Sequence, residues 1–278
     1  MAACGLDLAG ALTIGPDGSA PDASQLDSSV AEDAPFDTSS TDLDAGASGD
    51  ADATTDACPT TTTTFQNGTL SIPPKAKPVT IDGNLDEWSC AQFFTYNAAS
   101  AAVVDAVMPA ANTFSFAVSW DSAFIYVAAR VKDATMPRGG NTGTIIYQND
   151  SIEVYLGNSS PYTIAYSARE HQYVVDWANR AHVYQVTSTN PPPPNFSSAV
   201  TATASGFDVE LRVPASELGV ATLTAPMTLG IAFAANEHNG AQQHGWALWH
   251  RPSGVACNSG CCQIWCDARY LGGLVLKN

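Results

Sequence analysis

The feature that most constrains this fold is a series of short strand-like runs separated by turn-forming residues. Runs rich in valine, isoleucine, threonine and aromatic residues recur between clusters of glycine, proline, asparagine and aspartate, a pattern typical of all-β domains. The run 207–213 alternates strictly between apolar and charged residues, which predicts an antiparallel strand with one face in contact with water. The expected strands are 78–81, 113–120, 124–132, 151–156, 172–177, 182–187, 199–204, 207–213, 227–234, 245–249 and 271–276.

Helical signals are nearly absent from the same part of the chain. Only 214–219 has a helical pattern, with proline at its start and glycine at its end. The four prolines at 191–194 predict a stiff, exposed connection between strands. The sequence therefore predicts one antiparallel β-sandwich over residues 65–278, of jelly-roll or immunoglobulin-like type.

The N-terminal quarter has a different composition. Residues 1–57 contain twelve Asp and Glu and no Lys or Arg; the chain has 27 acidic and 11 basic residues, so the remainder has 15 acidic and 11 basic residues, a net charge of −4. With few large apolar side chains, this segment cannot bury enough surface to offset its ordering entropy. We predict that residues 1–64 form a disordered acidic tether.

Six of the seven cysteines lie in the predicted sandwich or at its edge. An even number of cysteines in an exported chain predicts up to three disulfide bonds, and six cysteines allow 15 pairings. The C-terminal cluster could alternatively bind zinc, but it has no tandem C-x2-C spacing and no nearby histidine pair, so disulfides are favoured. The six residues are Cys58, Cys90, Cys257, Cys261, Cys262 and Cys266.

Cys4 stands apart from the others. The residues Met1-Ala2-Ala3-Cys4-Gly5 resemble the end of a bacterial lipoprotein signal, in which an acylated cysteine would anchor the chain to a membrane. A chance cysteine near the start is the alternative. The chain has no run of about 18 apolar residues, and its scattered basic residues argue against nucleic-acid binding. We expect an exported monomer, either anchored at the outer membrane or cell surface or secreted.

Three phrases in a fixed order carry a family resemblance. They are Ile-Asp-Gly-Asn-Leu-Asp-Glu-Trp at 81–88, Ser-Trp-Asp at 119–121 leading into the run 124–133, and Asn-Asp-Ser-Ile-Glu-Val-Tyr-Leu at 149–156. Locally they read as a tight turn, a hairpin and a polar turn entering a strand. Together they resemble the family 9 carbohydrate-binding modules, which implies a β-sandwich that binds poly- or oligosaccharides without catalysis.

The resemblance also implies particular ligand-binding residues. In that family two aromatic rings clamp a terminal sugar, and the matching positions here are Tyr147 and Trp249. Glu153 matches the family's carboxylate and Gln172 its amide. Val174 stands where the family's sugar binder has an arginine, so this chain lacks a bidentate donor to sugar hydroxyls.

The remaining tryptophans have structural alternatives. Trp88 and Trp120 lie in the fold-defining phrases and are expected in the core, whereas Trp177 could belong to the core or to the site. Trp246 and Trp249 are three residues apart on one expected strand, so their side chains should point to opposite faces. We expect one of them to pack in the core and the other, Trp249, to bind the ligand.

An enzymatic function is not expected. Asp150 and Glu153 are a tempting pair of carboxylates for glycoside hydrolysis, but a spacing of three on one strand places them on opposite faces. No nucleophile-elbow motif is present. The histidines His238, His244 and His250 are expected in exposed loops rather than as metal ligands.

Calcium and haem are two further ligands that the sequence leaves as alternatives. The resemblance implies structural calcium, for which Asp82, Asp86 and Glu87 are the candidates. Some related sandwiches bind haem and transfer electrons, with Met108, Met136, His171 and His182 as nominal ligands here. A third alternative is a calcium-stabilised surface or adhesion domain that has no sugar site.

Overall fold

The computed structural model describes residues 63–278 with short gaps. The gaps are 107, 134, 136–138, 160–161, 164–165, 186–187, 191, 242 and 254–262. The predicted tether therefore lies outside the described residues except for Thr63 and Thr64, and Thr64 already begins the first strand.

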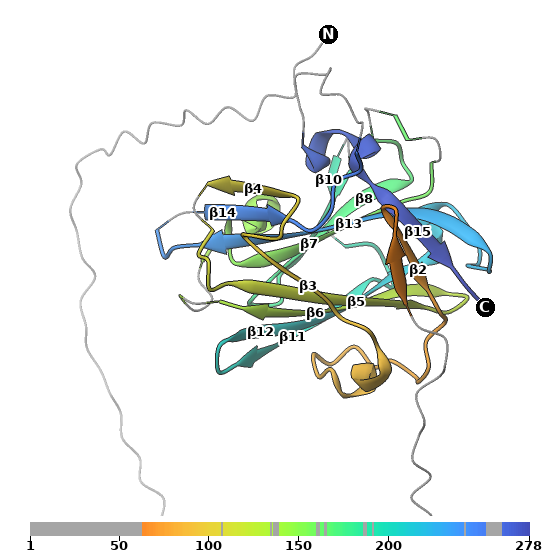
Figure 1. Ribbon diagram of the computed structural model, residues 1–278, viewed down its shortest axis with the longest axis horizontal. Helices are drawn as coiled ribbons and strands as arrows, with labels where there is room; N and C mark the ends of the chain where they lie inside the picture. Colours follow the sequence, from red (N-terminus) through yellow and green to blue (C-terminus); the bar gives the residue numbers. More distant parts are fainter. Residues whose placement is uncertain are drawn as a thin grey trace, which may run out of the picture. The chain divides into compact units, whose positions relative to one another are not determined.

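The described residues form two stacked β-sheets (Figure 1). The larger sheet runs in the order β1 (Thr64–Gln66), β2 (Thr69–Ile72), β15 (Gly272–Leu276), β13 (Met227–His238), β7 (Ser151–Gly157), β8 (Glu170–Asp176), β9 (Ala181–Gln185) and β10 (Ser188–Asn190). Strand β14 (Gln243–Leu248) pairs with β13 and with β4 (Val103–Ala106). The smaller sheet runs β11 (Ser197–Thr203), β12 (Gly206–Pro214), β6 (Phe124–Lys132), β5 (Thr113–Trp120) and β3 (Phe94–Asn97).

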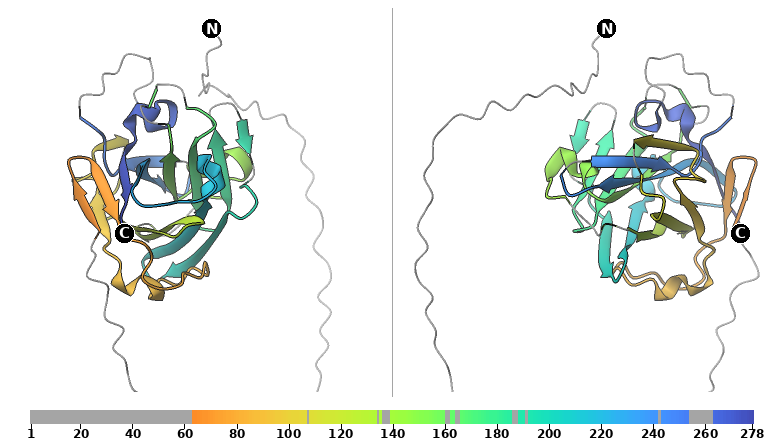
Figure 2. Two further views of the ribbon diagram at one scale, coloured as in Figure 1. Left: turned by 90° about the vertical axis from the view of Figure 1, so that its right-hand side faces the viewer. Right: turned by 60° about the vertical axis from the view of Figure 1, so that its left-hand side comes forward.

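All described strand pairs are antiparallel except β2 with β15. The hairpin β1–β2 therefore attaches to the larger sheet beside the C-terminal strand (Figure 2). The prediction of an all-β, antiparallel β-sandwich is confirmed, with the pair of β2 and β15 as a parallel exception among the described strands.

Most of the expected strands are present at nearly the predicted positions. Two of them, β5 and β6, begin and end where the sequence pattern does, and they form a hairpin closed by the amide of Asp121, which donates to the carbonyl of Phe124 at 3.0 Å. Strand β13 continues four residues beyond the expected end, to His238. The expectation of a strand at 78–81 is wrong, because this segment does not pair with any strand of the two sheets. Strands β1 to β4 and β10 were not expected.

The helical segments are all short. The expected helix at 214–219 is a 3-10 helix, η3 (Ala215–Leu218), which ends at Gly219 in the left-handed conformation with φ of 70°. The others are η1 (Asp86–Cys90), η2 (Gly143–Gln148), η4 (Ile264–Cys266) and η5 (Ala268–Tyr270). Within the described part of the chain, no helix is long and apolar enough to cross a membrane.

An aromatic cluster occupies the space between the sheets. The rings of Phe116 in β5 and Phe233 in β13 stack with centroids 3.7 Å apart, which joins the two sheets directly. Trp249 packs edge-on against Phe116 at 4.7 Å and also contacts Phe65 at 4.6 Å. Trp120 is buried in this core as expected. These rings add large buried apolar areas to an inter-sheet core that also contains many leucine, isoleucine and valine side chains from both sheets.

The outer face of the smaller sheet is covered around Glu210. Glu210, on the charged side of β12, is fully buried, so the expectation of a water-facing side is wrong at this position. Its carboxylate accepts hydrogen bonds from the Trp88 indole at 2.7 Å and from the amides of Gly83 at 2.9 Å and Asp82 at 3.0 Å. The first sequence phrase is therefore attached to the sheet by one buried carboxylate, with Trp88 buried beneath it as expected.

Replacement of Glu210 should test this attachment. Glu210→Ala leaves three donors without their acceptor, and unsatisfied buried donors cost about 1–3 kcal/mol each. Because some of these donors can rehydrate, we expect the free energy of unfolding to fall by about 3 kcal/mol in total, with a decrease in Tm of about 6–12 °C. Urea titration and calorimetry measure both quantities.

Asp208→Ala is the matched control for this experiment. Asp208 lies two residues earlier on the same face of β12 but is only half-buried, so its loss should cost less than about 1 kcal/mol. Equal losses in the two variants would show that the Glu210 hydrogen bonds do not hold the segment.

Candidate functional site

Strand β7 lies at the centre of the larger sheet and is buried on both faces. Ile152, Val154 and Leu156 point into the core between the sheets. Because successive side chains alternate, Glu153 and Tyr155 point to the opposite, outer face of the larger sheet. The site is built on this outer face.

The carboxylate of Glu153 is the centre of a buried hydrogen-bond network. It accepts from the hydroxyl of Tyr155 at 2.5 Å, the amide of Asn236 at 2.8 Å and the indole of Trp246 at 3.4 Å. The side chain of Gln172 is a further hydrogen-bond partner. Four donors occupy the roughly four acceptor positions of a carboxylate, so Glu153 fixes the positions of its neighbours.

Burial raises the pKa of Glu153 above the usual range of a carboxyl group, and the four hydrogen bonds oppose this shift only in part. Among the described residues, no cation forms an ion pair with it. A buried carboxylate without a cation requires donors of fixed geometry, which explains the dense network around it.

Two tyrosines lie beside the network on one side. Tyr184 on β9 is the cross-strand neighbour of Gln172, and its ring lies 6.2 Å from the ring of Tyr147 in η2. The hydroxyl of Tyr184 donates to the carbonyl of Thr144 at 2.7 Å, which fastens η2 to the sheet. The predicted residues Tyr147, Glu153 and Gln172 are thus brought to the same region of the outer face.

A second pair of rings lies on the β14 side of Glu153. Trp246 is buried, and its ring packs edge-on against Trp265 of η4 with centroids 5.1 Å apart. Trp265 is 45% exposed, the largest exposed fraction among the large apolar side chains that the structure describes. It lies in a cysteine-rich segment with no strand or helix periodicity, so the sequence pattern offered no signal for it.

Trp249 lies on the other side of the sheet from this network. Trp246 and Trp249 do point to opposite faces, as expected, but it is Trp249 that packs between the sheets with Phe65, Phe116 and Phe233. A ligand in contact with Glu153 or Gln172 would be separated from Trp249 by the sheet itself. Val174, beside Glu153, is completely buried.

Trp177 follows β8 at the end of the sheet and is 37% exposed. Its indole donates to the carbonyl of Gly139 at 3.2 Å, and its amide donates to the carbonyl of Asp150 at 3.0 Å. Trp177 is therefore a surface residue next to the turn that precedes β7, and it makes no described contact with the Glu153 network.

Three buried carboxylates meet at the end of the sandwich near Asp150. Asp133 follows β6, Asp150 precedes β7 and Glu237 lies near the end of β13, and one oxygen of each lies within 4.8 Å of the others. Burial, with a smaller contribution from the negative charge of Asp133, raises the pKa of Glu237 to about 7. Asp150 and Glu153 belong to different clusters, in agreement with the expectation that they do not share a site.

The three residues expected to bind calcium do not form such a cluster. Asp82 accepts from the Asn84 amide at 2.8 Å, Asp86 from the Asn84 side chain at 3.0 Å, and Glu87 from the Thr80 amide at 3.0 Å. These are local turn contacts of exposed or half-exposed side chains. These carboxylates stabilise the turn conformation of residues 81–88 through local hydrogen bonds.

The nominal haem ligands are spread over the molecule. His171 faces the core side of β8, where its Nε2 lies 2.8 Å from the carbonyl of Glu217, whereas His182 lies on the outer face. Met108 is buried in the inter-sheet core, and Met136 lies outside the described residues. No described pair of these residues flanks a common space.

The histidines of the last hairpin also differ from the expectation. His238 is buried, and its amide donates to Asp150 at 2.5 Å, so it is not an exposed loop residue. His250 is half-buried beside Phe65. The side chain of His244 lies outside the described part.

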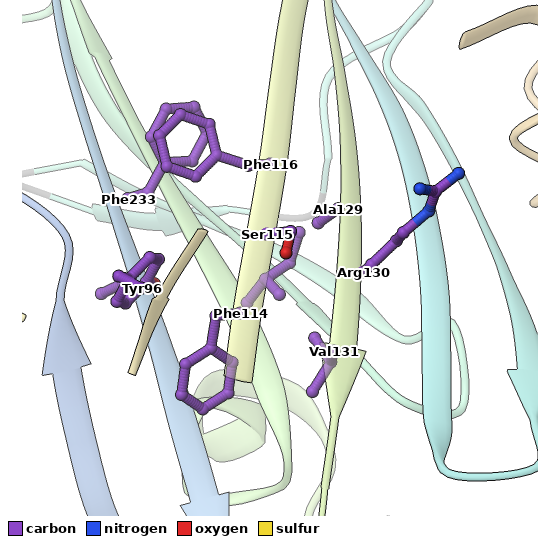
Figure 3. A pocket seen from close by; sticks show the side chains of 10 residues that line it. Tyr96, Phe114, Ser115, Phe116, Ala129, Arg130, Val131 and Phe233 are labelled. Carbon is purple, nitrogen blue, oxygen red and sulfur yellow. The ribbon is translucent and has the colours of Figure 1, made fainter. Parts of the chain in front are cut away.

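Two cavities lie away from the outer face of the larger sheet. One, of about 10 Å³, lies between the sheets and is lined by apolar side chains such as Tyr96, Phe114 and Phe233 (Figure 3). It has room for about one water molecule. The other, of about 160 Å³, lies beside the first phrase, with Lys75, Lys77 and Glu87 in its lining.

Five of the seven cysteines, Cys4, Cys58, Cys257, Cys261 and Cys262, lie outside the described residues. The disulfide framework and the lipid anchor at Cys4 therefore stay predictions.

Comparisons with known proteins agree with this architecture. Residues 81–278 match the model of the carbohydrate family 9 binding domain-like family. The chain is 30% identical over 159 residues to exoglucanase XynX of Acetivibrio thermocellus and 29% identical to endo-1,4-beta-xylanase A of Thermoanaerobacterium saccharolyticum. Each match covers 56% of this chain but only 13% and 12% of these relatives, so the chain corresponds to a small part of them.

Solved structures show the same fold. A family 9 module from Caldicellulosiruptor kristjanssonii in complex with cellotriose superposes with a TM-score of 0.59 at 20% identity, covering 76% of this chain and 94% of the module. A putative carbohydrate-binding protein from Bacteroides uniformis gives a TM-score of 0.55 at 13% identity, covering 75% and 99%.

The environment of Glu153 predicts a pH dependence of stability. Because its pKa is raised in the folded state, the native protein binds more protons than the unfolded chain above about pH 4.5. The contribution of Glu153 to stability should therefore fall as the pH rises from about 4.5 through the folded pKa. Glu153→Gln resembles the protonated form and should remove this part of the decline.

Urea unfolding of both proteins at pH 4.5 and 7.5 measures the effect. We expect the parent protein to lose more stability between these values than Glu153→Gln. Identical losses would mean that Glu153 is already ionised at no cost in the folded state.

Proposed function

Since the chain belongs to the carbohydrate family 9 binding domain-like proteins, we propose that it is a non-catalytic carbohydrate-binding protein. Its sugar site is the outer face of the larger sheet around Glu153. The observation that carries this proposal is one arrangement: a fully satisfied buried carboxylate, flanked on the same face by Tyr147 on one side and the exposed Trp265 on the other.

The chemistry of this face suits a sugar. A pyranose presents apolar C–H groups above and below its ring and hydroxyls around its edge, so it is bound by aromatic rings together with amides and hydroxyls. Tyr147 and Trp265 supply the rings, and Gln172 and Tyr184 supply polar groups between them. Glu153 holds Gln172 and Trp246 in fixed positions, and a ligand hydroxyl that reached the carboxylate would replace one of its donors.

Val174 shapes the ligand preference. Where an arginine could donate twice to a pair of hydroxyls, this chain has a buried apolar side chain in the row between Glu153 and His182. We infer that recognition here depends more on stacking than on charge-assisted hydrogen bonds. Neutral oligosaccharides are accordingly the preferred class, and cello-oligosaccharides are the first to test because a structural neighbour was solved with cellotriose.

A binding role without catalysis agrees with the placement of the carboxylates. Glycoside hydrolysis requires two carboxyl groups about 5–10 Å apart on either side of one bond. Asp150, the carboxylate that the sequence offers as a partner for Glu153, lies instead with Asp133 and Glu237, on the opposite side of the pleat from Glu153. The relatives include an exoglucanase and a xylanase. From these names we infer that the chain binds a plant-type polysaccharide outside the cell, either at the cell surface or after secretion.

Binding is best tested by titration of the full chain with glucose, cellotriose and xylo-oligosaccharides, followed by calorimetry. We expect saturable binding, and we expect Tyr147→Ala and Trp265→Ala each to weaken it at least tenfold, which corresponds to about 1.4 kcal/mol. Trp265 is exposed, so its replacement should leave the Tm nearly unchanged.

Phe93→Leu serves as the matched control. Phe93 is an aromatic residue on the outer face of the smaller sheet, where it contacts Arg130, far from Glu153 in the sheet order. Its replacement should not alter sugar affinity. A flat response of the parent protein across a broad glycan array would refute the function, and binding that survives both site variants would refute this location.

A further inference from the structure

We propose that Cys90 forms a disulfide bond with Cys58, which precedes the described residues by five positions. The sequence leaves all 15 pairings of the six cysteines open. The fold narrows them, because Cys90 lies beside the start of the described chain and far from the C-terminal cysteines. The bond fixes the point at which the acidic N-terminal segment joins the sandwich.

Cys90 lies on the outer side of the smaller sheet. It is the last residue of η1, and Trp88 of the same helix packs on this face of the sheet against Ala117 and Tyr126. Cys90 is half-buried and belongs to the lining of the cavity of about 160 Å³, which Thr63 also lines. The first described residue of the chain is therefore separated from Cys90 by no more than this cavity.

The chain is long enough to bring Cys58 to Cys90. Five residues separate Cys58 from Thr63, and they span up to about 17 Å when extended, more than the width of such a cavity. Thr63 is only 7% exposed, so the chain is already packed against the sandwich there. The compact unit that contains the sandwich runs from Thr55 to Asn278, and Cys58 belongs to it.

The C-terminal cysteines lie on the other side of the molecule. Cys266 ends η4, whose Ile264 packs with Tyr155 and Trp246 on the outer face of the larger sheet. Figures 1 and 2 show η1, in gold, and η4, in blue, beyond opposite sheets in each view. The two sheets alone are about 10 Å apart, whereas a disulfide joins Cα atoms at most about 7 Å apart.

Chain connectivity ties the other three C-terminal cysteines to the side of η4. Cys261 and Cys262 lie directly before Gln263, and two residues span at most about 7 Å. Cys257 lies four residues earlier in the same connection. Cys58 is therefore the partner that the fold allows for the cysteine of η1.

Formation of the bond is an oxidation by thiol–disulfide exchange. The two thiols lose two protons and two electrons to a disulfide oxidant such as glutathione disulfide, which leaves as two glutathione thiols. An oxidising compartment supplies such an oxidant, in agreement with the proposed location outside the cell. The closed loop contains β1, β2 and the first phrase, so the bond holds these segments to one another.

The pairing also sets the direction of attachment. The segment before Cys58 joins the domain on the side of the smaller sheet, whereas the outer face of the larger sheet points the other way (Figure 1). If the N-terminal segment is a tether, the sugar site faces away from the surface to which the tether is attached. This consequence rests on the proposed function, but the pairing itself does not.

Peptide mapping of the full chain tests the pairing. Protein produced in an oxidising compartment is alkylated without reduction and cleaved before its aspartates, which separates the cysteines into the fragments 1–6, 56–81, 86–104 and 208–266. We expect 56–81 and 86–104 to be joined and to separate on reduction. A link from 86–104 to 208–266 or to 1–6, or an alkylated Cys90, overturns the proposal.

Cys58→Ser and Cys90→Ser measure the effect of the bond on stability. Each should lower the Tm by about 5–10 °C, because the unfolded chain is no longer constrained by the closed loop. The double variant should melt at the same temperature as the single variants, since all three lack the same bond. Additive decreases would contradict a shared bond, and mapping of the parent protein decides the question even if a variant does not fold.

Cys4→Ser is the matched control, and it should change neither the Tm nor the linked fragments. Sugar titration is an independent readout: the Cys58 and Cys90 variants should bind cellotriose with a Kd within about twofold of the parent value, because the bond lies beyond the other sheet. A parent protein that contains the linked fragments but binds no glycan would leave the disulfide intact and refute only the sugar site.

Discussion

The structure depends on the burial of both faces of β7 and β13. These two strands lie side by side at the centre of the larger sheet, and nearly every residue along them is excluded from water. A strand that is buried on both sides has no solvated face to receive polar groups, so each polar residue on it must find a partner within the protein. Glu153, Asn236 and Glu237 are therefore organised into defined clusters, and the proposed sugar site is built around Glu153 on β7.

The two clusters are separated by the pleat of the sheet. Asn236 and Glu237 are neighbours in the chain, yet Asn236 faces outward to Glu153 while Glu237 faces inward to Asp133. The same alternation separates Asp150 from Glu153. Neighbouring residues of one strand thus belong to a hydrogen-bonded network on one face and to a cluster of carboxylates on the other. The sheet separates the two groups of side chains.

The residues of the proposed sugar site were only partly predictable from the sequence. Glu153 belongs to the third phrase, Tyr147 lies two residues before it and Gln172 lies on the strand that pairs with it, and the structure brings the three to one face. Trp265 could not be found this way, because η4 owes its position to packing of the C-terminal segment against Trp246 and Tyr166 rather than to a local pattern. Spacing alone indicated that Trp246 and Trp249 point in opposite directions, but which of them faces the core depends on the pairing of β14 with β13.

The sequence by itself determined strands β5 to β9 and β11 to β15, the hairpin β5–β6 and the short helix before Gly219, because these follow from local alternation and turn residues. The family was indicated by the resemblance of three phrases in a fixed order. Only the tertiary structure decided that Glu210 is buried, that Trp249 packs between the sheets and that three distant carboxylates meet at one end of the sandwich. The physical reason is the same in each case. Burial and charge clustering are set by which segments lie over which face of a sheet, and a segment's own residues do not encode what covers it.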